Sequence, residues 1–186
     1  IDIGGESTRP GAVPGSLEEE INRTIPVIEA IRKISNISIS IDTYKSEVAE
    51  KALLAGADFI NDISGLTFDS KMIEIVKKFD VPVVLMHIKG TPRNMQTNPT
   101  YIDVIKELLE FFSFQIQKAL DIGIKKEQII IDPGIGFGKQ LNDNFILIRR
   151  LKEFSELGFP ILIGPSRKSF IGLTLDVPSE DRLEGT

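Results

Sequence analysis

The chain of 186 residues has a formal net charge of −5, contains no cysteine and is 41% hydrophobic. This length and composition allow one globular domain with a sizeable core, and the acidic balance argues against nucleic acid or an anionic membrane as a partner. The absence of cysteine excludes disulfides and thiolate metal sites, and no apolar run approaches the roughly 18 residues that a membrane helix needs. We expect a cytoplasmic protein, in which cations must gather locally if an anionic small molecule binds.

Short apolar runs, polar or glycine-rich loops and helical patterns follow one another along the whole chain. The apolar runs predict six strands, at residues 1–3, 37–41, 59–60, 81–86, 129–132 and 161–163. Helical spacing predicts helices after Ser16 and at residues 48–54, 69–79, 101–120 and 142–154. A capping box of Ser16 and Glu19 marks the start of the first helix. Helix ends are indicated by Gly56, Gly123 and Gly158.

Six strand–loop–helix units predict parallel strands joined by right-handed crossovers. Two closures fit this pattern, an open doubly wound sheet and a (β/α)8 barrel. An open sheet concentrates its site at one switch point, whereas polar motifs follow all six predicted strands here, as in a barrel. We therefore predict an α/β fold of the (β/α)8 barrel type. Because a whole barrel needs about 250 residues, we expect residues 1–186 to be a single barrel domain truncated at both ends, without the first strand and the last strand and helix.

The segment 129–139 is the most informative part of the chain. Three consecutive isoleucines predict a buried strand that ends on Asp132, and the proline and three glycines that follow make the backbone turn tightly. Asp42 and Asn61 also stand at predicted strand ends, and in a barrel these three side chains converge at one mouth. Their acceptors and one donor suit the edge of a planar heterocycle with ring N–H and amino groups. The alternative is that each acid only caps the next helix or pairs with a lysine.

Two loops supply candidate cations. Lys168 follows the last predicted strand, and it could pair with an acid or hold an electron-rich ring position; the alternative is a solvated basic loop. Arg9 lies in a glycine-rich loop after the first strand, and its guanidinium can form two hydrogen bonds to a phosphate or carboxylate.

His87, the only histidine, stands at the end of a predicted strand. A lone histidine is more often packed or solvent-facing than catalytic, and no second histidine or cysteine is available for a metal site or a nucleophilic triad. The glycines at positions 134, 136 and 138 lack the spacing of a phosphate-binding nucleotide loop.

Six motifs together make the chain resemble the dihydropteroate synthases of folate biosynthesis. They are Gly4–Gly11, Ile41–Thr43, Asn61–Asp62, Met86–His87, Asp132–Lys139 and Ser166–Phe170, which occur in the family's order along the whole chain. The resemblance implies a transferase with a (β/α)8 barrel that joins 4-aminobenzoate to 6-hydroxymethyl-7,8-dihydropterin pyrophosphate, giving 7,8-dihydropteroate and pyrophosphate. It also implies Mg²⁺ as cofactor, a homodimer and a role as the target of sulfonamides.

The same resemblance assigns roles to individual positions. The residues expected to bind the pterin are Asp42, Asn61, Met86, Asp132, Phe137, Gly164 and Lys168. The residues expected to bind 4-aminobenzoate are Thr8, Arg9, Pro10, Phe137, Ser166 and Lys168. The expected catalytic residues are Asp132, which would balance charge on the pterin, Lys168 and Asp42.

Two parts of the family pattern are absent from this chain. The first-strand segment that carries the family's Mg²⁺ ligand is missing, so no metal ligand is expected here, and the last-strand arginine and histidine that bind the phosphates are missing too. We expect the native full-length protein to be active and this 186-residue piece to be inactive.

Two other functions remain open. The pterin-binding barrel of a methyltetrahydrofolate–corrinoid methyltransferase shares acids and an asparagine at similar strand ends, but the loops at residues 6–11 and 166–170 disfavour it, because methyl transfer needs no aminobenzoate loop. The third possibility is a non-enzymatic module that binds a pterin without turnover.

Overall fold

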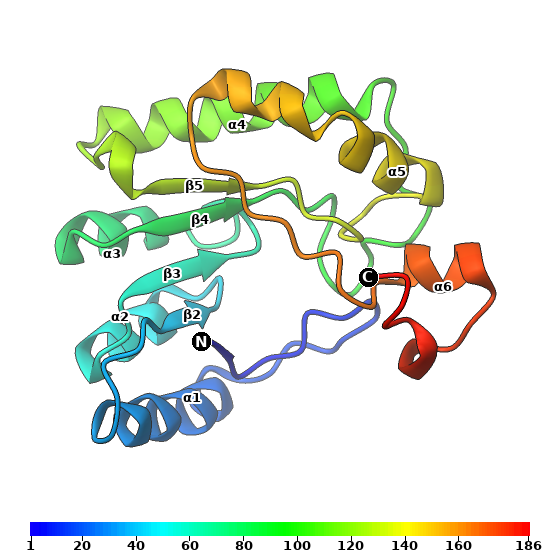
Figure 1. Cartoon of the computed structure of the whole chain (residues 1–186). Coiled ribbons are helices and arrows are strands. Elements are labelled where there is room, and N and C mark those ends of the chain that lie inside the picture. Colours follow the sequence, from blue (N-terminus) through cyan, green and yellow to red (C-terminus); the bar gives the residue numbers. More distant parts are fainter.

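Five parallel strands form one sheet in the order β1-β2-β3-β4-β5, and the computed structural model describes all 186 residues. The strands are β1 (Asp2–Gly4), β2 (Ser40–Asp42), β3 (Phe59–Asp62), β4 (Val83–Met86) and β5 (Ile129–Asp132). Each strand pairs with the next one along the chain, and the order never reverses as it does in a doubly wound sheet. The predicted α/β class is confirmed, and the sequential strand order is that of a (β/α)8 barrel (Figure 1).

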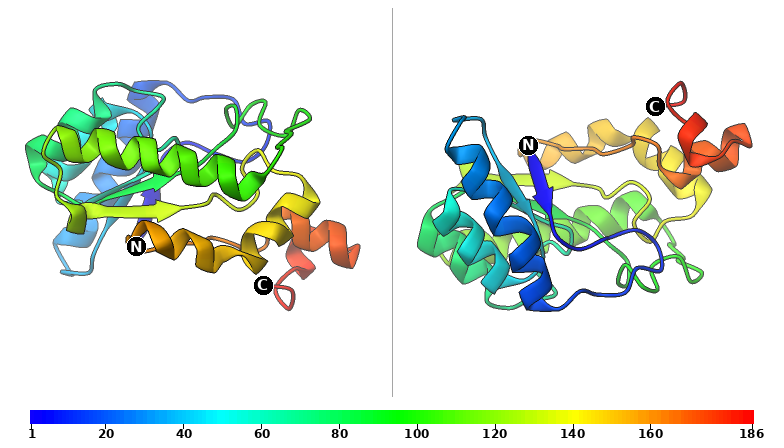
Figure 2. Two further views of the ribbon diagram at one scale, coloured as in Figure 1. Left: turned by 90° about the horizontal axis from the view of Figure 1, so that it is seen from above. Right: turned by 90° about the horizontal axis from the view of Figure 1, so that it is seen from below.

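Helices connect the strands and extend beyond β5. The α-helices are α1 (Leu17–Arg32), α2 (Ser46–Ala55), α3 (Met72–Phe79), α4 (Val104–Asp121), α5 (Leu141–Arg149) and α6 (Ser169–Leu175). The 3-10 helices are η1 (Lys126–Gln128), η2 (Leu151–Leu157) and η3 (Ser179–Asp181). Helices α1 to α4 lie against one face of the sheet, as two further views show (Figure 2). None of the helices combines the length and the apolar character that crossing a membrane requires.

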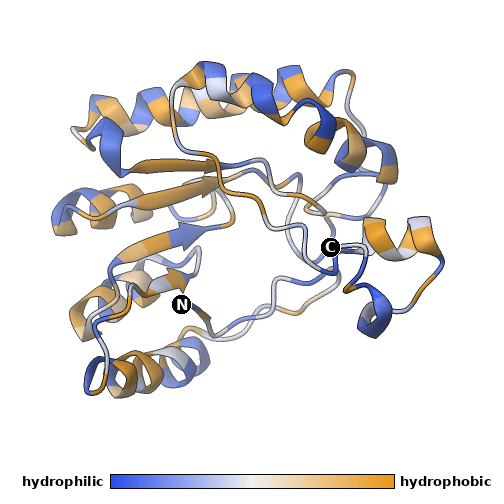
Figure 3. Ribbon diagram, viewed as in Figure 1, coloured by the Kyte–Doolittle hydropathy of each residue, from blue (hydrophilic) through white to orange (hydrophobic).

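The two faces of the sheet differ in composition because side chains alternate along each strand. One face packs against α1 to α4, and its strand residues in the main core are Ile3, Ile41, Ile60, Val83, Leu85, Ile129 and Ile131. The opposite face carries the polar residues Asp42 and Asn61, which are register partners on β2 and β3. In Figure 3, β4 and β5 are coloured as hydrophobic and the end of β3 as hydrophilic. Asp42 and Asn61 therefore lie on the face turned away from the helical core.

Local signals explain most element boundaries. Ser16 Oγ accepts a hydrogen bond from Glu19 N at 3.2 Å and Glu19 Oε2 accepts one from Ser16 N at 3.0 Å, which confirms the capping box. Helix α3 begins at Met72, three residues later than predicted, because Asp69 instead accepts hydrogen bonds from the backbone N–H groups of Ser46 and Lys71. The predicted helix at residues 142–154 is divided into α5 and η2 by Arg150, which has φ −104° and ψ 17°.

The prediction of a sixth strand at residues 161–163 is wrong. Only Ile161 forms a bridge, with Ile131, through the bonds from Ile131 N to Pro160 O (3.0 Å) and from Leu162 N to Ile131 O (2.9 Å). The next bond of a parallel ladder would need an N–H at position 133, and Pro133 has none. The segment therefore leaves the sheet after one bridge.

Candidate active site

Burial raises the pKa values of both Asp42 and Asp132, and the positive charge of Lys168 acts on each carboxylate and opposes this rise. Asp42 ends β2, Asp132 ends β5, and Lys168 immediately precedes α6. The topology thus brings together three residues from distant parts of the chain. The two acids that sequence analysis grouped do lie at one mouth of the sheet.

Asp42 is the more unusual of the two acids. Burial raises its pKa to about 7, and the nearby carboxylates of Asp2, Glu20 and Asp62 act in the same direction. Its Oδ1 atom is buried and has no hydrogen-bond partner in the protein. Because a buried acceptor without a partner costs free energy, Asp42 is prepared to accept a hydrogen bond from a ligand.

Asp132 is 6% exposed, and its Oδ1 accepts a hydrogen bond from Gly134 N at 2.7 Å. Burial raises its pKa to about 6, whereas the Gly134 bond and the charges of Lys139 and Lys168 oppose this rise. Position 134 must be glycine, because its φ is +68° and a Cβ atom would lie 2.1 Å from the carbonyl oxygen of His87. The loop after β5 is therefore folded tightly against the end of β4.

Asn61 and Met86 lie near these acids in different surroundings. Asn61 Nδ2 donates a hydrogen bond to Asp2 Oδ2 at 3.2 Å. Met86 is 4% exposed and packs in a small apolar cluster with Ile63, Ile88, Met95 and Phe137. Gly164 is exposed, and no neighbouring atom lies within 4 Å of the position of a Cβ atom there. The structure does not join Gly164 to the other predicted pterin residues.

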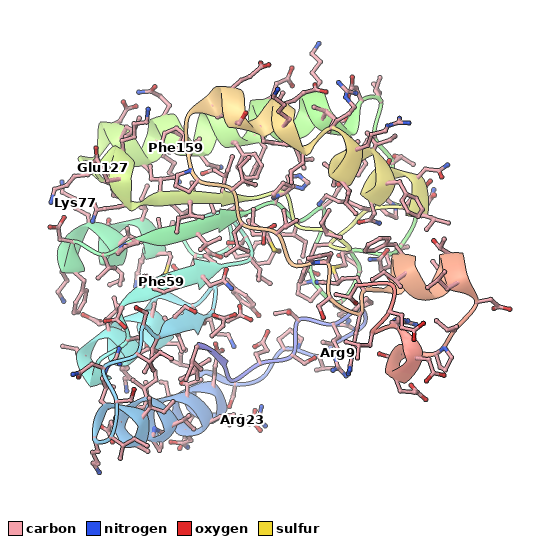
Figure 4. All side chains as sticks on the ribbon, viewed as in Figure 1. Arg9, Arg23, Phe59, Lys77, Glu127 and Phe159 are labelled. Carbon is pink, nitrogen blue, oxygen red and sulfur yellow. The ribbon has the colours of Figure 1, made fainter.

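A cavity of about 510 Å³ opens between the loops after β1, β4 and β5, the start of α6 with the segment before it, and the C-terminal segment, and we call it the cationic cavity. Its lining residues are Thr8, Arg9, Pro10, Met95, Gly136, Phe137, Ser166, Arg167, Lys168, Ser169, Ser179 and Arg182. Every residue predicted for the 4-aminobenzoate side is among them. Four of the lining residues are cations and none is an acid, so the cavity suits an anionic ligand. In Figure 4, Arg9 lies on the first loop beside the C-terminal segment of the chain.

Arg182 and Ser169 line this cavity although neither is among the site residues predicted from the sequence. Arg182 Nη1 donates to the carbonyl oxygen of Arg167 at 3.1 Å, and its Nε atom is buried without a partner. No motif in the segment 179–186 marks this arginine as part of a site, so only the folding of that segment against residue 167 could reveal it.

His87 is a packed residue, one of the two outcomes expected for a lone histidine. It is 8% exposed, its ring packs edge-to-face on Phe111 with ring centres 4.9 Å apart, and its Nδ1 lies 3.1 Å from Lys139 Nζ. Burial and the charges of Lys139 and Lys89 lower the pKa of His87 to about 2. The imidazole is therefore neutral at physiological pH.

Lys139 joins the loops after β4 and β5. Its Nζ donates to the carbonyl oxygens of His87 (3.1 Å) and Phe137 (2.9 Å), and the residue is 3% exposed. Burial lowers its pKa to about 7, and the charge of Asp132 opposes this effect. In the sequence, Lys139 stands only at the end of a motif, and no role was predicted for it.

The chain contains no group of three or more His, Cys, Asp or Glu side chains placed to hold a metal ion. The carboxylates described above do not form a binding set for the predicted Mg²⁺, which prefers near-octahedral oxygen ligands. We therefore assign no chemical step in this chain to a metal ion.

The sequence model of the pterin binding enzyme family matches residues 1–186. The chain therefore belongs to the pterin binding enzymes. Within that family it is similar to the dihydropteroate synthases: the one from Synechocystis sp. is 53% identical over 187 residues, and the match covers 100% of this chain and 65% of that relative. The chain thus spans a little less than two thirds of the length of this relative.

Solved structures agree with this result. The Yersinia pestis dihydropteroate synthase with a sulfonamide drug complex has a TM-score of 0.96 and 43% identity, and the match covers 100% of this chain and 67% of that chain. The Clostridium difficile dihydropteroate synthase in the presence of pteroic acid has a TM-score of 0.93 and 45% identity, and the match covers 100% of this chain and 68% of that chain. The predicted resemblance and the incomplete barrel are confirmed, and these relatives do not favour the methyltransferase alternative.

Proposed function

We propose that the protein carrying this chain condenses 4-aminobenzoate with 6-hydroxymethyl-7,8-dihydropterin pyrophosphate, giving 7,8-dihydropteroate and pyrophosphate. One observation carries the proposal: the cationic cavity adjoins, through Lys168, the two buried carboxylates at the strand ends. An acidic pocket next to a cationic one matches two substrates, one rich in N–H donors and one a carboxylate. The pteroic acid of the Clostridium difficile structure contains both parts.

The strand ends are proposed to bind the pterin. The ring N–H and amino groups of a pterin are donors, and Asp42 Oδ1 is a buried acceptor that lacks one. Asp132, with a pKa of about 6, is mostly ionised at neutral pH and can accept a charge-assisted hydrogen bond. A ligand without these donors would leave the buried carboxylates unpaired, which costs binding free energy. The site therefore binds a pterin more tightly than a ligand that lacks these N–H groups. Asn61 and Met86 remain proposed neighbours of the ring.

The cationic cavity is proposed to bind 4-aminobenzoate. Arg9, Arg167 and Arg182 can pair with its carboxylate, and the hydroxyl groups of Thr8 and Ser166 can donate to it. The Phe137 ring offers a face for the benzene ring. The sulfonamide drug in the Yersinia pestis structure supports the prediction that sulfonamides compete for this cavity.

The proposed reaction breaks the C–O bond to pyrophosphate, which leaves with the bonding electrons. Positive charge then develops on the methylene carbon and is spread into the pterin ring. The lone pair of the aryl amine forms the new C–N bond, and the amine nitrogen loses one proton to solvent. Asp132 stabilises the charge on the ring electrostatically, without a covalent intermediate. Lys168 keeps the two substrates adjacent, since it faces the acids and contacts Phe137.

Mg²⁺, a homodimer and a cytoplasmic location remain predictions from the family resemblance. The decisive experiment incubates the native protein with both substrates and follows pyrophosphate and 7,8-dihydropteroate. We expect pyrophosphate release that depends on 4-aminobenzoate. Pterin binding without release would support a binding module, and methyl transfer from methyltetrahydrofolate to a corrinoid would support the alternative enzyme.

A further inference from the structure

The loop Gly5–Gly15, which joins β1 to α1, is closed at both ends by one side chain, Lys45. Lys45 Nζ donates to Glu6 Oε2 at 2.5 Å, near the start of the loop, and to the carbonyl oxygen of Gly15 at 2.9 Å, at its end. The backbone N–H of Gly15 also donates to Glu6 Oε2, at 3.0 Å. The two ends of the loop are thus held together, and Thr8, Arg9 and Pro10 lie between them.

The same lysine ties the loop to the end of β2. Its third hydrogen bond goes to Glu20 Oε2 at 2.7 Å, so all three ammonium donors are used. Glu20 Oε1 accepts from Thr43 Oγ1 at 2.6 Å, and Glu6 Oε1 accepts from Tyr44 Oη at 2.5 Å. Thr43 and Tyr44 directly follow Asp42 along the chain. The loop that carries Arg9 is therefore attached to the segment that carries Asp42.

Both carboxylates of this network are shielded from water. The side chains of Glu6 and Glu20 are 7% and 2% exposed, and that of Lys45 is 20% exposed. Loss of the lysine would leave two buried carboxylates without a counter-charge, and the negative charges of Glu6 and Glu20 would then repel each other. The middle of the loop has weaker support, since its link to the loop after β4 is one backbone bond, from Gly11 N to Pro92 O at 2.9 Å.

We propose that Lys45 is a positioning residue that sets the place of Thr8, Arg9 and Pro10 relative to Asp42, and so controls the affinity for 4-aminobenzoate and not the affinity for the pterin. Lys45 lines neither the cationic cavity nor the acidic strand ends, so it acts only through the loop. The effect on 4-aminobenzoate rests on the proposed function, whereas the closure of the loop can be tested without any ligand.

The first test compares Lys45→Met with Lys51→Met in the native protein. Lys51 lies on α2, the helix that begins directly after Lys45. Its side chain is exposed and makes no hydrogen bond or ion pair, so its variant is the matched control. We expect Lys45→Met to raise the KM for 4-aminobenzoate about tenfold at saturating pterin pyrophosphate. The Kd of the pterin should change less than about twofold, because no pterin contact is altered, and Lys51→Met should change neither constant.

A general loss of structure would weaken both ligands alike. Equal changes in the KM for 4-aminobenzoate and the Kd of the pterin, or no change in either, would overturn the proposal. Glu6→Ala serves as the second variant, because it opens the loop but leaves Lys45 paired with Glu20, so no buried charge lacks a partner. It should raise the KM for 4-aminobenzoate in the same selective way.

Amide hydrogen exchange tests the loop closure in the ligand-free protein. The N–H of Gly15 donates to Glu6, whereas the N–H of Thr8 has no acceptor in the protein. We expect slow exchange at Gly15, fast exchange at Thr8, and loss of the Gly15 protection in Glu6→Ala. Equally fast exchange at both positions in the unmodified protein would overturn the closure itself, even if the proposed function holds.

Discussion

The ammonium nitrogen of Lys168 lies 4.1 Å from the centre of the Phe137 ring. This cation–π contact attaches the loop before α6 to the loop after β5. Burial lowers the pKa of Lys168, and the charges of Asp132 and Asp42 oppose that effect. Lys168 is therefore the residue that physically joins the acidic strand ends to the cationic cavity.

Lys168→Ala should lower kcat/KM by on the order of 10²-fold, since it removes a charged contact from both substrate regions. Steady-state kinetics with both substrates measures the effect. Lys125→Ala is the control, because Lys125 pairs with Asp80 at an exposed position. Unchanged pterin affinity in Lys168→Ala would show that the pterin lies elsewhere.

Asp132→Asn should also lower kcat/KM by on the order of 10²-fold, because the charged hydrogen bond that we propose between Asp132 and the pterin would be replaced by a neutral one. The same variant should raise the free energy of unfolding at pH 7 by on the order of 1 kcal/mol. The folded protein holds the Asp132 proton up to a pKa of about 6, well above the usual value for aspartate, so its carboxylate form is the less stable one.

Urea unfolding as a function of pH measures this stability difference. Because the unfolded chain releases the proton at lower pH than the folded protein, stability falls as pH rises through this window. The advantage of Asp132→Asn should therefore be small near pH 4 and full above pH 6. A difference that does not vary with pH would contradict the assigned burial of the charge.

His87→Asn should remove a part of the acid sensitivity of folding. The folded protein keeps His87 neutral down to a pKa of about 2, whereas the unfolded chain binds a proton near the ordinary histidine pKa of 6.5. Stability from this residue is thus complete above pH 6.5 and is lost as pH falls, by about 2 kcal/mol at pH 5.

The comparison of the unmodified protein with His87→Asn isolates this contribution, because His87 is the only histidine. The asparagine oxygen can still accept a hydrogen bond from Lys139. Identical slopes of the unfolding free energy between pH 5 and 7 in both proteins would mean that folding does not lower the pKa of His87.

The 186-residue chain on its own should be inactive and prone to aggregation. The outer edge of β1 has no partner strand, and β5 is followed only by the single bridge to Ile161. Unpaired strand edges promote association between chains, and Leu162 and Ile163 are 37% and 39% exposed. Light scattering and a turnover assay of the isolated chain check this expectation, and normal product formation by a monomer would contradict it.

Local patterns in the sequence were sufficient for the strand–loop–helix units and for the polar strand ends. The isoleucine run before Asp132 and the capping box of Ser16 and Glu19 act over a few residues, so they can be read directly from the chain. The prediction of a sixth strand at residues 161–163 was wrong because of a residue next to its partner strand. Pro133, directly after β5, has no N–H to continue the ladder of hydrogen bonds.

Such local patterns could not predict contacts between residues that are far apart in the sequence. Lys45 meets Glu6 from 39 residues away, and Lys139 meets His87 from 52 residues away. The residues next to a lysine in the sequence do not indicate which carboxylate or carbonyl its ammonium group will bind. The partner depends on how the successive crossovers place the loops at one end of the sheet. The polar residues at the strand ends could therefore be predicted from the sequence. Only the folded chain shows which partners hold the loops in place and that a cavity lies between those loops.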